Sequence, residues 1–285
     1  SIGSSLIMSN TYKYLVASDM DHTLIYPGKD VSPRNREAIR ALQDKGVAIT
    51  IATGRTSFLI GKYTDDLGIT ESCITSNGGA LFDPTTLTDV FSDDINEATV
   101  KDMIAFFFER HLDFVCYACE AVYFAPYSNR KQFFVEYNKG TPDRLKAKIA
   151  DFTEEMLAIG NYPRFNKLLV VGADEDSVQK IMARTDVDAV FSQKDFLDIM
   201  KPGASKGNGL LKLADMLGVP HENTFAIGDN DNDLSMLLAA GHGIAMGNSS
   251  DEIKAQCEYT TDTCLEDGFA KAVFDYILPI VDKGE

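Results

Sequence analysis

The chain contains 285 residues, with 43 acidic and 27 basic side chains, and its formal net charge is −16. A hydrophobic fraction of 45% and a charged fraction of 25% are typical of a globular protein, which excludes a disordered chain, a collagen-like chain and a small disulfide-rich protein. The surplus of negative charge repels other polyanions, so nucleic acid is not an expected partner.

Five scattered cysteines favour a reducing, cytoplasmic compartment over a disulfide framework. The longest charge-free stretch, residues 234–250, is broken by glycines, and no secretory signal is recognisable, so no membrane partner is expected. Residues 1–11 are interpreted as an N-terminal tail, with the seven residues before Met8 as a remnant of cloning. The sequence does not indicate an oligomeric state.

The first third of the chain alternates short apolar runs with segments of helical length. Strands are predicted at residues 14–18, 47–52 and 73–76, because each run is typical of a strand buried on both faces. Helices are predicted at residues 32–46 and 56–68. Strands separated by helices in this way predict a parallel sheet.

The middle of the chain has a different pattern. From about residue 83, adjacent strands are mixed with longer helices, which predicts an α+β insert. The predicted strands are residues 114–119, 122–127 and 167–171, and the predicted helices are residues 96–111, 142–157 and 176–184.

After residue 202 the alternation of strand and helix returns. The predicted strands are residues 224–227 and 243–246, and the predicted helices are residues 205–217, 231–240 and 267–278. We therefore expect an α/β parallel-sheet domain formed by residues 12–82 and 200–285, interrupted by an α+β domain of residues 83–199.

Polar residues follow the predicted parallel strands, where ligands of such sheets bind. Asp19 and Asp21 follow the first strand, Thr53-Gly54-Arg55 follow the second, and an acidic run at residues 228–233 follows a strand of the last third. Converging carboxylates favour a hard divalent cation such as Mg²⁺, and Lys206, a hydroxyl and backbone N–H groups would suit a phosphate. This combination predicts phosphoryl transfer, with a carboxylate as nucleophile.

These residues resemble the four motifs of the haloacid dehalogenase-like hydrolases. The order and spacing most resemble the Cof-type phosphatase branch, which has a large α+β (type IIB) cap between the second and third motifs. The resemblance runs from about residue 12 onward and implies a Rossmann-like core with an inserted cap. The motifs are Asp19-x-Asp21-x-Thr23, Thr53-Gly54-Arg55, Lys206 and Gly228-Asp229-x-x-Asn232-Asp233, and the segments 76–80 and 205–207 are also similar.

The family resemblance implies a role for each carboxylate. Asp19 would attack phosphorus and become phosphorylated, and Asp21 would protonate the leaving alkoxide and then activate water. Mg²⁺ would be held by Asp19, the backbone carbonyl of Asp21 and Asp229, with Asp233 close by or behind these ligands.

The resemblance also implies a phosphate-binding set. Thr53, Lys206, the Gly54 amide and Asn232 would bind phosphoryl oxygens, and Lys206 would lower the pKa of Asp19. Arg55 either contacts the substrate or closes a structural ion pair, and the sequence leaves both roles open.

Each of these motifs also has a simpler interpretation. An isolated Asp-x-Asp is most often a solvated loop, and the acidic run fails as a calcium-binding EF-hand because Leu234 and Ala240 stand where Gly and Glu are needed. His22 replaces a residue that is often Gly in the family.

Cys116-x-x-Cys119 has no second pair at zinc spacing, so packing cysteines are expected.

The predicted function is a Mg²⁺-dependent phosphatase that hydrolyses a small phosphomonoester, such as a sugar phosphate. The alternatives are a phosphosugar mutase and a non-catalytic phosphate-binding module. The insert is expected to close over the cleft as a lid and to supply substrate selectivity.

Overall fold

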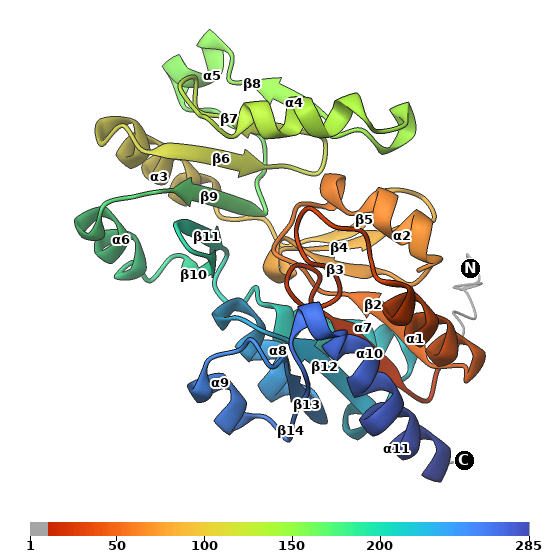
Figure 1. Cartoon of the computed structure of the whole chain (residues 1–285). Coiled ribbons are helices and arrows are strands. Elements are labelled where there is room, and N and C mark those ends of the chain that lie inside the picture. The colour runs from red at the N-terminus through yellow and green to blue at the C-terminus, as the bar shows by residue number, and fades with distance from the viewer. Residues whose placement is uncertain (1–10, 285) are drawn as a thin grey trace, which may run out of the picture. The chain divides into compact units, whose positions relative to one another are not determined.

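Short apolar runs from the two ends of the chain assemble into one parallel sheet. In the computed structural model, which describes residues 11–284, β1 (Leu15–Ser18) lies between β2 (Ala48–Ile51) and β12 (Thr224–Gly228). β13 (His242–Ala245) and β14 (Tyr259–Thr260) complete the order β14-β13-β12-β1-β2 (Figure 1). All four strand pairings are parallel, which confirms the predicted α/β class.

Helices cover this sheet and continue from its strands. α1 (Pro33–Asp44) packs against β2 and against α10 (Gly268–Ala272), and it begins after Ser32, whose side chain accepts a hydrogen bond from the Asn35 N–H. α8 (Leu234–Ala239) packs against β12 and β13, and α7 (Lys206–Leu217) packs against α8. The remaining helices of this part are α9 (Asp251–Gln256) and α11 (Leu278–Lys283).

The middle of the chain builds a second, six-stranded sheet of order β10-β11-β9-β6-β7-β8. Its pairings are antiparallel except for the parallel pair β7 and β8. The strands are β6 (Asp113–Tyr117), β7 (Val122–Phe124), β8 (Ile149–Asp151), β9 (Lys167–Val171), β10 (Asp188–Gln193) and β11 (Phe196–Met200), and the helices are α3 (Glu97–Glu109), α4 (Lys131–Lys139), α5 (Glu154–Ile159) and α6 (Glu175–Met182).

Both faces of the six-stranded sheet carry a buried apolar cluster, because side chains alternate between the faces of a strand. Phe114 of β6 packs on one face in a cluster that includes Phe107 of α3. Val115 packs on the other face with Phe134 of α4 and Leu59. The insert therefore has its own hydrophobic core.

The chain divides into two compact units. Unit 1 comprises Ser1–Thr53, Glu71–Cys73 and Lys206–Glu285, and unit 2 comprises Gly54–Thr70 and Ile74–Ser205. Unit 2 thus also contains α2 (Gly61–Leu67), β4 (Ala80–Asp83) and β5 (Thr88–Ser92), and β3 (Cys73–Thr75) spans a boundary. The domain limits predicted at residues 83 and 199 stay a prediction, and residues 1–10 of the predicted tail lie outside the described residues.

One predicted helix is wrong. Residues 142–157 form a short 3₁₀ turn, then β8, then the start of α5. Leu145 and Ala147 are buried while Lys146 and Lys148 are exposed, and this period of two is typical of a strand edge and excludes a helical face.

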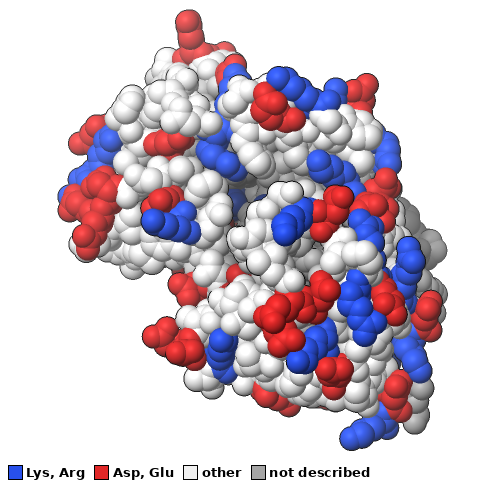
Figure 2. Space-filling model, in the orientation of Figure 1, with Lys and Arg blue, Asp and Glu red and all other residues white. Residues whose placement is uncertain are grey.

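On the face drawn in Figure 2, Lys and Arg side chains are interspersed with Asp and Glu side chains. Among residues 11–284, no helix combines the length and the apolar character needed to cross a membrane.

Candidate active site

The parallel register brings three of the predicted motifs to the same edge of the unit 1 sheet. Ser18 at the end of β1 pairs with Ile227 of β12 and with Ile51 of β2. The Asp19 N–H donates to the Ile227 carbonyl at 2.9 Å, which extends the pairing beyond the strand. Asp19, Asp229 and Thr53 consequently leave their strands at a common edge, as predicted for ligand-binding residues of a parallel sheet.

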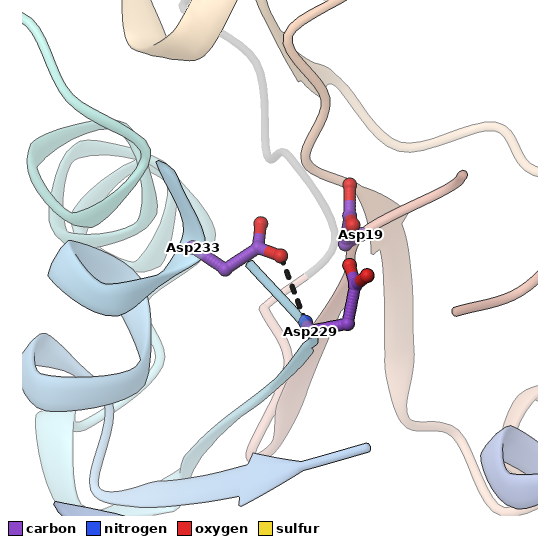
Figure 3. A group of neighbouring side chains, drawn as sticks. All are labelled: Asp19, Asp229 and Asp233. Atoms are coloured by element: carbon purple, nitrogen blue, oxygen red, sulfur yellow. Dashed lines mark hydrogen bonds between the residues drawn. The ribbon is translucent and has the colours of Figure 1, made fainter. Parts of the chain in front are cut away.

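Three carboxylates gather at this edge. Asp19, Asp229 and Asp233 each place a carboxylate oxygen within 4.8 Å of the others. In Figure 3 the three side chains point toward one another from the ends of β1 and β12 and from the turn before α8. Asp19 is 6% exposed and Asp233 is fully buried, so water screens their mutual repulsion poorly.

A buried lysine enters this carboxylate cluster. Lys206, whose side chain is fully buried, donates through Nζ to Asp19 Oδ1 at 3.0 Å and to Asp233 Oδ1 at 2.6 Å. Lys206 is the first residue of α7, and Gly207 follows it. A Cβ on Gly207 would lie 2.5 Å from the Ser235 carbonyl oxygen, so glycine allows the first turn of α7 to approach α8 closely enough to place the ammonium.

Asp233 is fixed by its own loop. Its Oδ2 accepts hydrogen bonds from the N–H groups of Asp229 at 2.9 Å and Asn230 at 3.1 Å. Its Oδ1 accepts from Lys206, so both oxygens have partners within the protein. Asn232, a predicted phosphate ligand, is 8% exposed in the same turn.

Burial and charge shift the pKa of each of the central groups. Burial, together with the negative charge of Asp233, raises the pKa of Asp19 well above its ordinary value. Lys206 acts in the predicted direction and lowers the pKa of Asp19, but burial outweighs it. Burial also raises the pKa of Asp229. For Lys206 itself, burial lowers the pKa, but the carboxylates of Asp19 and Asp233 more than offset this and raise it above its ordinary value.

The cluster fits a hard divalent cation. Three carboxylates face one ammonium, so a further positive charge would offset the burial and the mutual repulsion that raise the pKa of Asp19 and of Asp229. Carboxylate oxygens are the ligands that Mg²⁺ takes in proteins. The side chain of Asp21 is not part of this cluster, and its predicted contribution through the backbone carbonyl stays a prediction.

The turn after Asp19 has a left-handed residue. His22 adopts a φ of 62°, and its N–H donates to the Ile25 carbonyl at 2.8 Å. Glycine adopts this conformation without strain, whereas a residue with a Cβ does not. The family motif often has Gly at this position, so His22 adds backbone strain to the turn.

Sequence reasoning missed Asn248, which ties this turn to the acidic loop. Its Nδ2 donates to the His22 carbonyl at 3.1 Å and to Asp229 Oδ2 at 3.3 Å, while its Oδ1 accepts from the Cys264 N–H at 3.0 Å. The available signal was its position: Asn248 closely follows β13, at the same edge of the sheet.

The second motif is divided between the two units. Thr53 is 1% exposed in unit 1, whereas Gly54 and Arg55 belong to unit 2. The Gly54 carbonyl accepts a hydrogen bond from Lys167, and the Arg55 guanidinium lies 5.5 Å from the centre of the Tyr63 ring. The structure thus brings together Asp19, Asp229, Asp233 and Lys206, and the phosphate-binding roles of Thr53, Gly54, Arg55 and Asn232 stay predictions.

The two cysteines of the insert, Cys116 and Cys119, do not form a disulfide. Cys116 is buried in β6, which confirms its predicted packing role, whereas the prediction is wrong for Cys119, which is exposed. Both thiols are free.

Comparison with known proteins supports the same family. Residues 16–273 match the model of the family described as haloacid dehalogenase-like hydrolase. The chain is 28% identical to 5-amino-6-(5-phospho-D-ribitylamino)uracil phosphatase YcsE of Bacillus subtilis over 93% of its own length and 96% of that protein. It is also 28% identical to pyridoxal phosphate phosphatase YbhA of Escherichia coli, over 93% and 98% of the two chains.

A solved structure shows the same similarity in three dimensions. The fold of this chain is similar to that of a haloacid dehalogenase-like hydrolase from B. subtilis, with a TM-score of 0.78 and 26% identity over 91% of this chain and 98% of the other. The family match covers most of the chain, and the relatives align over almost their whole lengths. This protein therefore belongs to the haloacid dehalogenase-like hydrolases, in the Cof-type branch of phosphatases that its motifs predict.

Proposed function

We propose that the protein hydrolyses small phosphomonoesters with Mg²⁺, through a phosphoryl group carried on Asp19. The observation that carries this proposal is the buried ammonium of Lys206, held between Asp19 and Asp233 in a cluster that also contains Asp229. A carboxylate beside a fixed cation, at the binding edge of a parallel sheet, is suited to attack a phosphoryl group.

Asp19 and Asp21 divide the chemistry between them. An Asp19 carboxylate oxygen bonds to phosphorus while the bond from phosphorus to the ester oxygen breaks, and Asp21 gives its proton to the departing alkoxide. Asp21 then takes a proton from water, whose oxygen attacks the same phosphorus. Inorganic phosphate leaves, and Asp19 returns to a carboxylate.

Asp19 and Asp229 are the residues that would hold Mg²⁺. When bound, the ion supplies positive charge that neutralises phosphoryl oxygens and lets Asp19 ionise. Asp233 serves to orient Lys206 and the acidic loop, because both of its oxygens already accept hydrogen bonds from the protein.

In this proposal, the phosphoryl oxygens are also bound by Lys206, Thr53, the Gly54 amide and Asn232. The support is local: Lys206 touches the nucleophile directly, and Thr53 leaves the strand next to β1. A fixed ammonium and fixed hydroxyl and amide dipoles stabilise charge in the transition state without reorganisation.

The substrate class we propose is a sugar phosphate or a related small metabolite. The two named relatives act on a ribityl phosphate attached to an aminouracil and on pyridoxal phosphate, which are both small phosphate esters. We further propose that residues 83–199 act as the cap that supplies selectivity, and that the protein works in the cytoplasm.

The test is a panel of phosphorylated metabolites, assayed for released inorganic phosphate with Mg²⁺ and with EDTA. We expect hydrolysis of several phosphomonoesters that EDTA abolishes and added Mg²⁺ restores. Phosphate transfer within a sugar phosphate, without release, would instead favour a mutase. Phosphate binding without turnover would indicate a non-catalytic binding module.

A further inference from the structure

Two charged side chains lie inside the six-stranded sheet of unit 2. On β9, Lys167 and Leu169 share a face because side chains alternate along a strand. Asp198 of β11 pairs with Leu169 and so lies on that same face. Lys167 is 3% exposed and Asp198 is fully buried.

The two charges meet each other and the second motif. Lys167 Nζ lies 3.6 Å from Asp198 Oδ1 and donates a hydrogen bond to the backbone carbonyl of Gly54. The Nζ also lies 4.6 Å from the centre of the Tyr117 ring. The Asn77 side-chain amide donates to Asp198 Oδ2, which adds a further fixed partner to the pair.

A buried ion pair of this kind is poor evidence for stability. Removing two charges from water has a large free-energy cost, and a well-packed apolar pair of similar volume is often as stable. Burial raises the pKa of Asp198, and the charge of Lys167 opposes this shift. An apolar pair would lose the hydrogen bond from Asn77 to Asp198 and the hydrogen bond from the ammonium to the Gly54 carbonyl, and the second of these holds a residue of the second motif.

Gly54 fits closely into this arrangement. A Cβ at residue 54 would lie 3.1 Å from both Asn77 Oδ1 and Asp198 Oδ2, which is tighter than ordinary packing. Glycine has wide backbone freedom, so without outside contacts this peptide could rotate. The carbonyl belongs to the peptide that follows Gly54, so fixing it restricts ψ of Gly54. The close packing of Asn77 and Asp198 around this residue limits the space in which the turn can move.

We propose that Lys167 and Asp198 are positioning residues, which fix the Gly54 peptide so that the turn after Thr53 is ready to bind phosphate. The proposal rests on the function proposed above, in which the Gly54 amide binds a phosphoryl oxygen. Neither residue touches the substrate in this account. Their effect is on phosphate affinity, and it is the same for every leaving group.

The test compares inorganic phosphate binding, with Mg²⁺ present, and KM for two phosphomonoesters with different leaving groups. Lys167→Met should weaken phosphate binding and raise both KM values by a common factor of about 10 or more, since small misplacements of binding groups have effects of this size. The double variant Lys167→Met/Asp198→Asn leaves no unpaired buried charge, so it can be measured even if the single variant folds poorly. It should show the same increase in both KM values.

A matched control is Lys180→Met, which removes a lysine of unit 2 whose ion pair with Asp176 at 3.1 Å is exposed. It should leave phosphate binding and KM unchanged. A merely structural role would lower the folded fraction, and with it kcat per total protein, without moving KM or the affinity for phosphate.

The outcomes separate the two proposals. If the wild type binds phosphate and the double variant binds it equally well, the positioning role is wrong. A wild type that binds phosphate but hydrolyses no phosphomonoester contradicts the proposed function alone. A wild type that does not bind phosphate contradicts both.

Discussion

Among residues 11–284, two lysines are buried, and their surroundings differ. In unit 1, Lys206 contacts two carboxylates, and Asp229 adds a third to the cluster. In unit 2, Lys167 contacts the carboxylate of Asp198 and the backbone carbonyl of Gly54. Negative charge therefore exceeds positive charge in the cluster around Lys206, whereas Lys167 and Asp198 form a pair with one charge of each sign.

This difference in charge separates two kinds of role. An excess of carboxylates destabilises the site through mutual repulsion, and it favours the binding of a further cation. A pair with one charge of each sign does not favour cation binding in this way, and the hydrogen bond from its lysine to a backbone carbonyl points to positioning. Removing charges from each site should distinguish the two roles, and the expected effects are given from the largest to the smallest.

The largest effect is expected from the nucleophile in the unit 1 cluster. Asp19→Asn should lower kcat by about 10⁴-fold or more, because the amide cannot form the phosphorylated intermediate and the loss of a nucleophile acts on this scale. The control is Asp231→Asn, an exposed carboxylate of the nearby acidic loop, which should retain activity. Equal losses in both variants would show that net charge, and not Asp19 itself, is responsible.

Removing either lysine should lower stability, but with a different response to metal. Lys206→Met and Lys167→Met should each lower the free energy of unfolding by about 3–5 kcal/mol in EDTA, because each leaves buried carboxylate charge without its cation. Mg²⁺ should restore the Tm of Lys206→Met more than that of Lys167→Met, because it replaces the missing charge in unit 1. Equal responses to Mg²⁺ in thermal unfolding would remove the distinction between the two sites.

A smaller effect is expected from the carboxylate that would hold the metal. Asp229→Asn should raise the Mg²⁺ concentration needed for half-maximal activity by at least about 10-fold, since metal sites lose affinity on this scale when a supporting group is changed. Asp231→Asn should leave this concentration unchanged. A parallel shift in both variants would point to the general field of the loop instead of coordination.

The smallest effect concerns the backbone of the unit 1 site. His22→Gly should raise the free energy of unfolding by up to about 1 kcal/mol, because glycine tolerates the left-handed φ of 62°. His22→Ala keeps the strain and loses the edge contact with the Tyr26 ring at 5.5 Å, so it should not be stabilising. Denaturant unfolding of the two variants measures the difference, and equal stability would show that strain at this turn is negligible.

Most of the unit 1 cluster was predictable from sequence because its carboxylates lie directly after short buried strands. Asp19, Thr53 and the acidic run each follow a short buried strand, and parallel strands end at one edge. Lys206 was predicted as a phosphate ligand from its place at the start of a helix, but nothing near it in the chain indicates that its ammonium lies between Asp19 and Asp233.

The unit 2 pair was not predictable in the same way. Lys167 and Asp198 lie on strands β9 and β11, which are adjacent in the sheet but distant in sequence, and β11 was not predicted at all. A charged residue inside the apolar run Phe196–Met200 was the available signal. Antiparallel sheets joined by long connections leave strand neighbours open, so such a pair requires the tertiary structure.

The central claim, that Asp19 carries the phosphoryl group, is tested most directly by trapping the intermediate. The wild type and Asp21→Asn are mixed with Mg²⁺ and a phosphomonoester substrate, quenched in acid during turnover, and digested for mass spectrometry. We predict a phosphoryl group on Asp19 in both proteins. With an aryl phosphate, whose leaving group departs without a proton, the occupancy should be greater in Asp21→Asn because the water that releases the phosphoryl group is no longer activated. Sustained turnover by the wild type with no phosphoryl group on Asp19 in either protein would contradict the account.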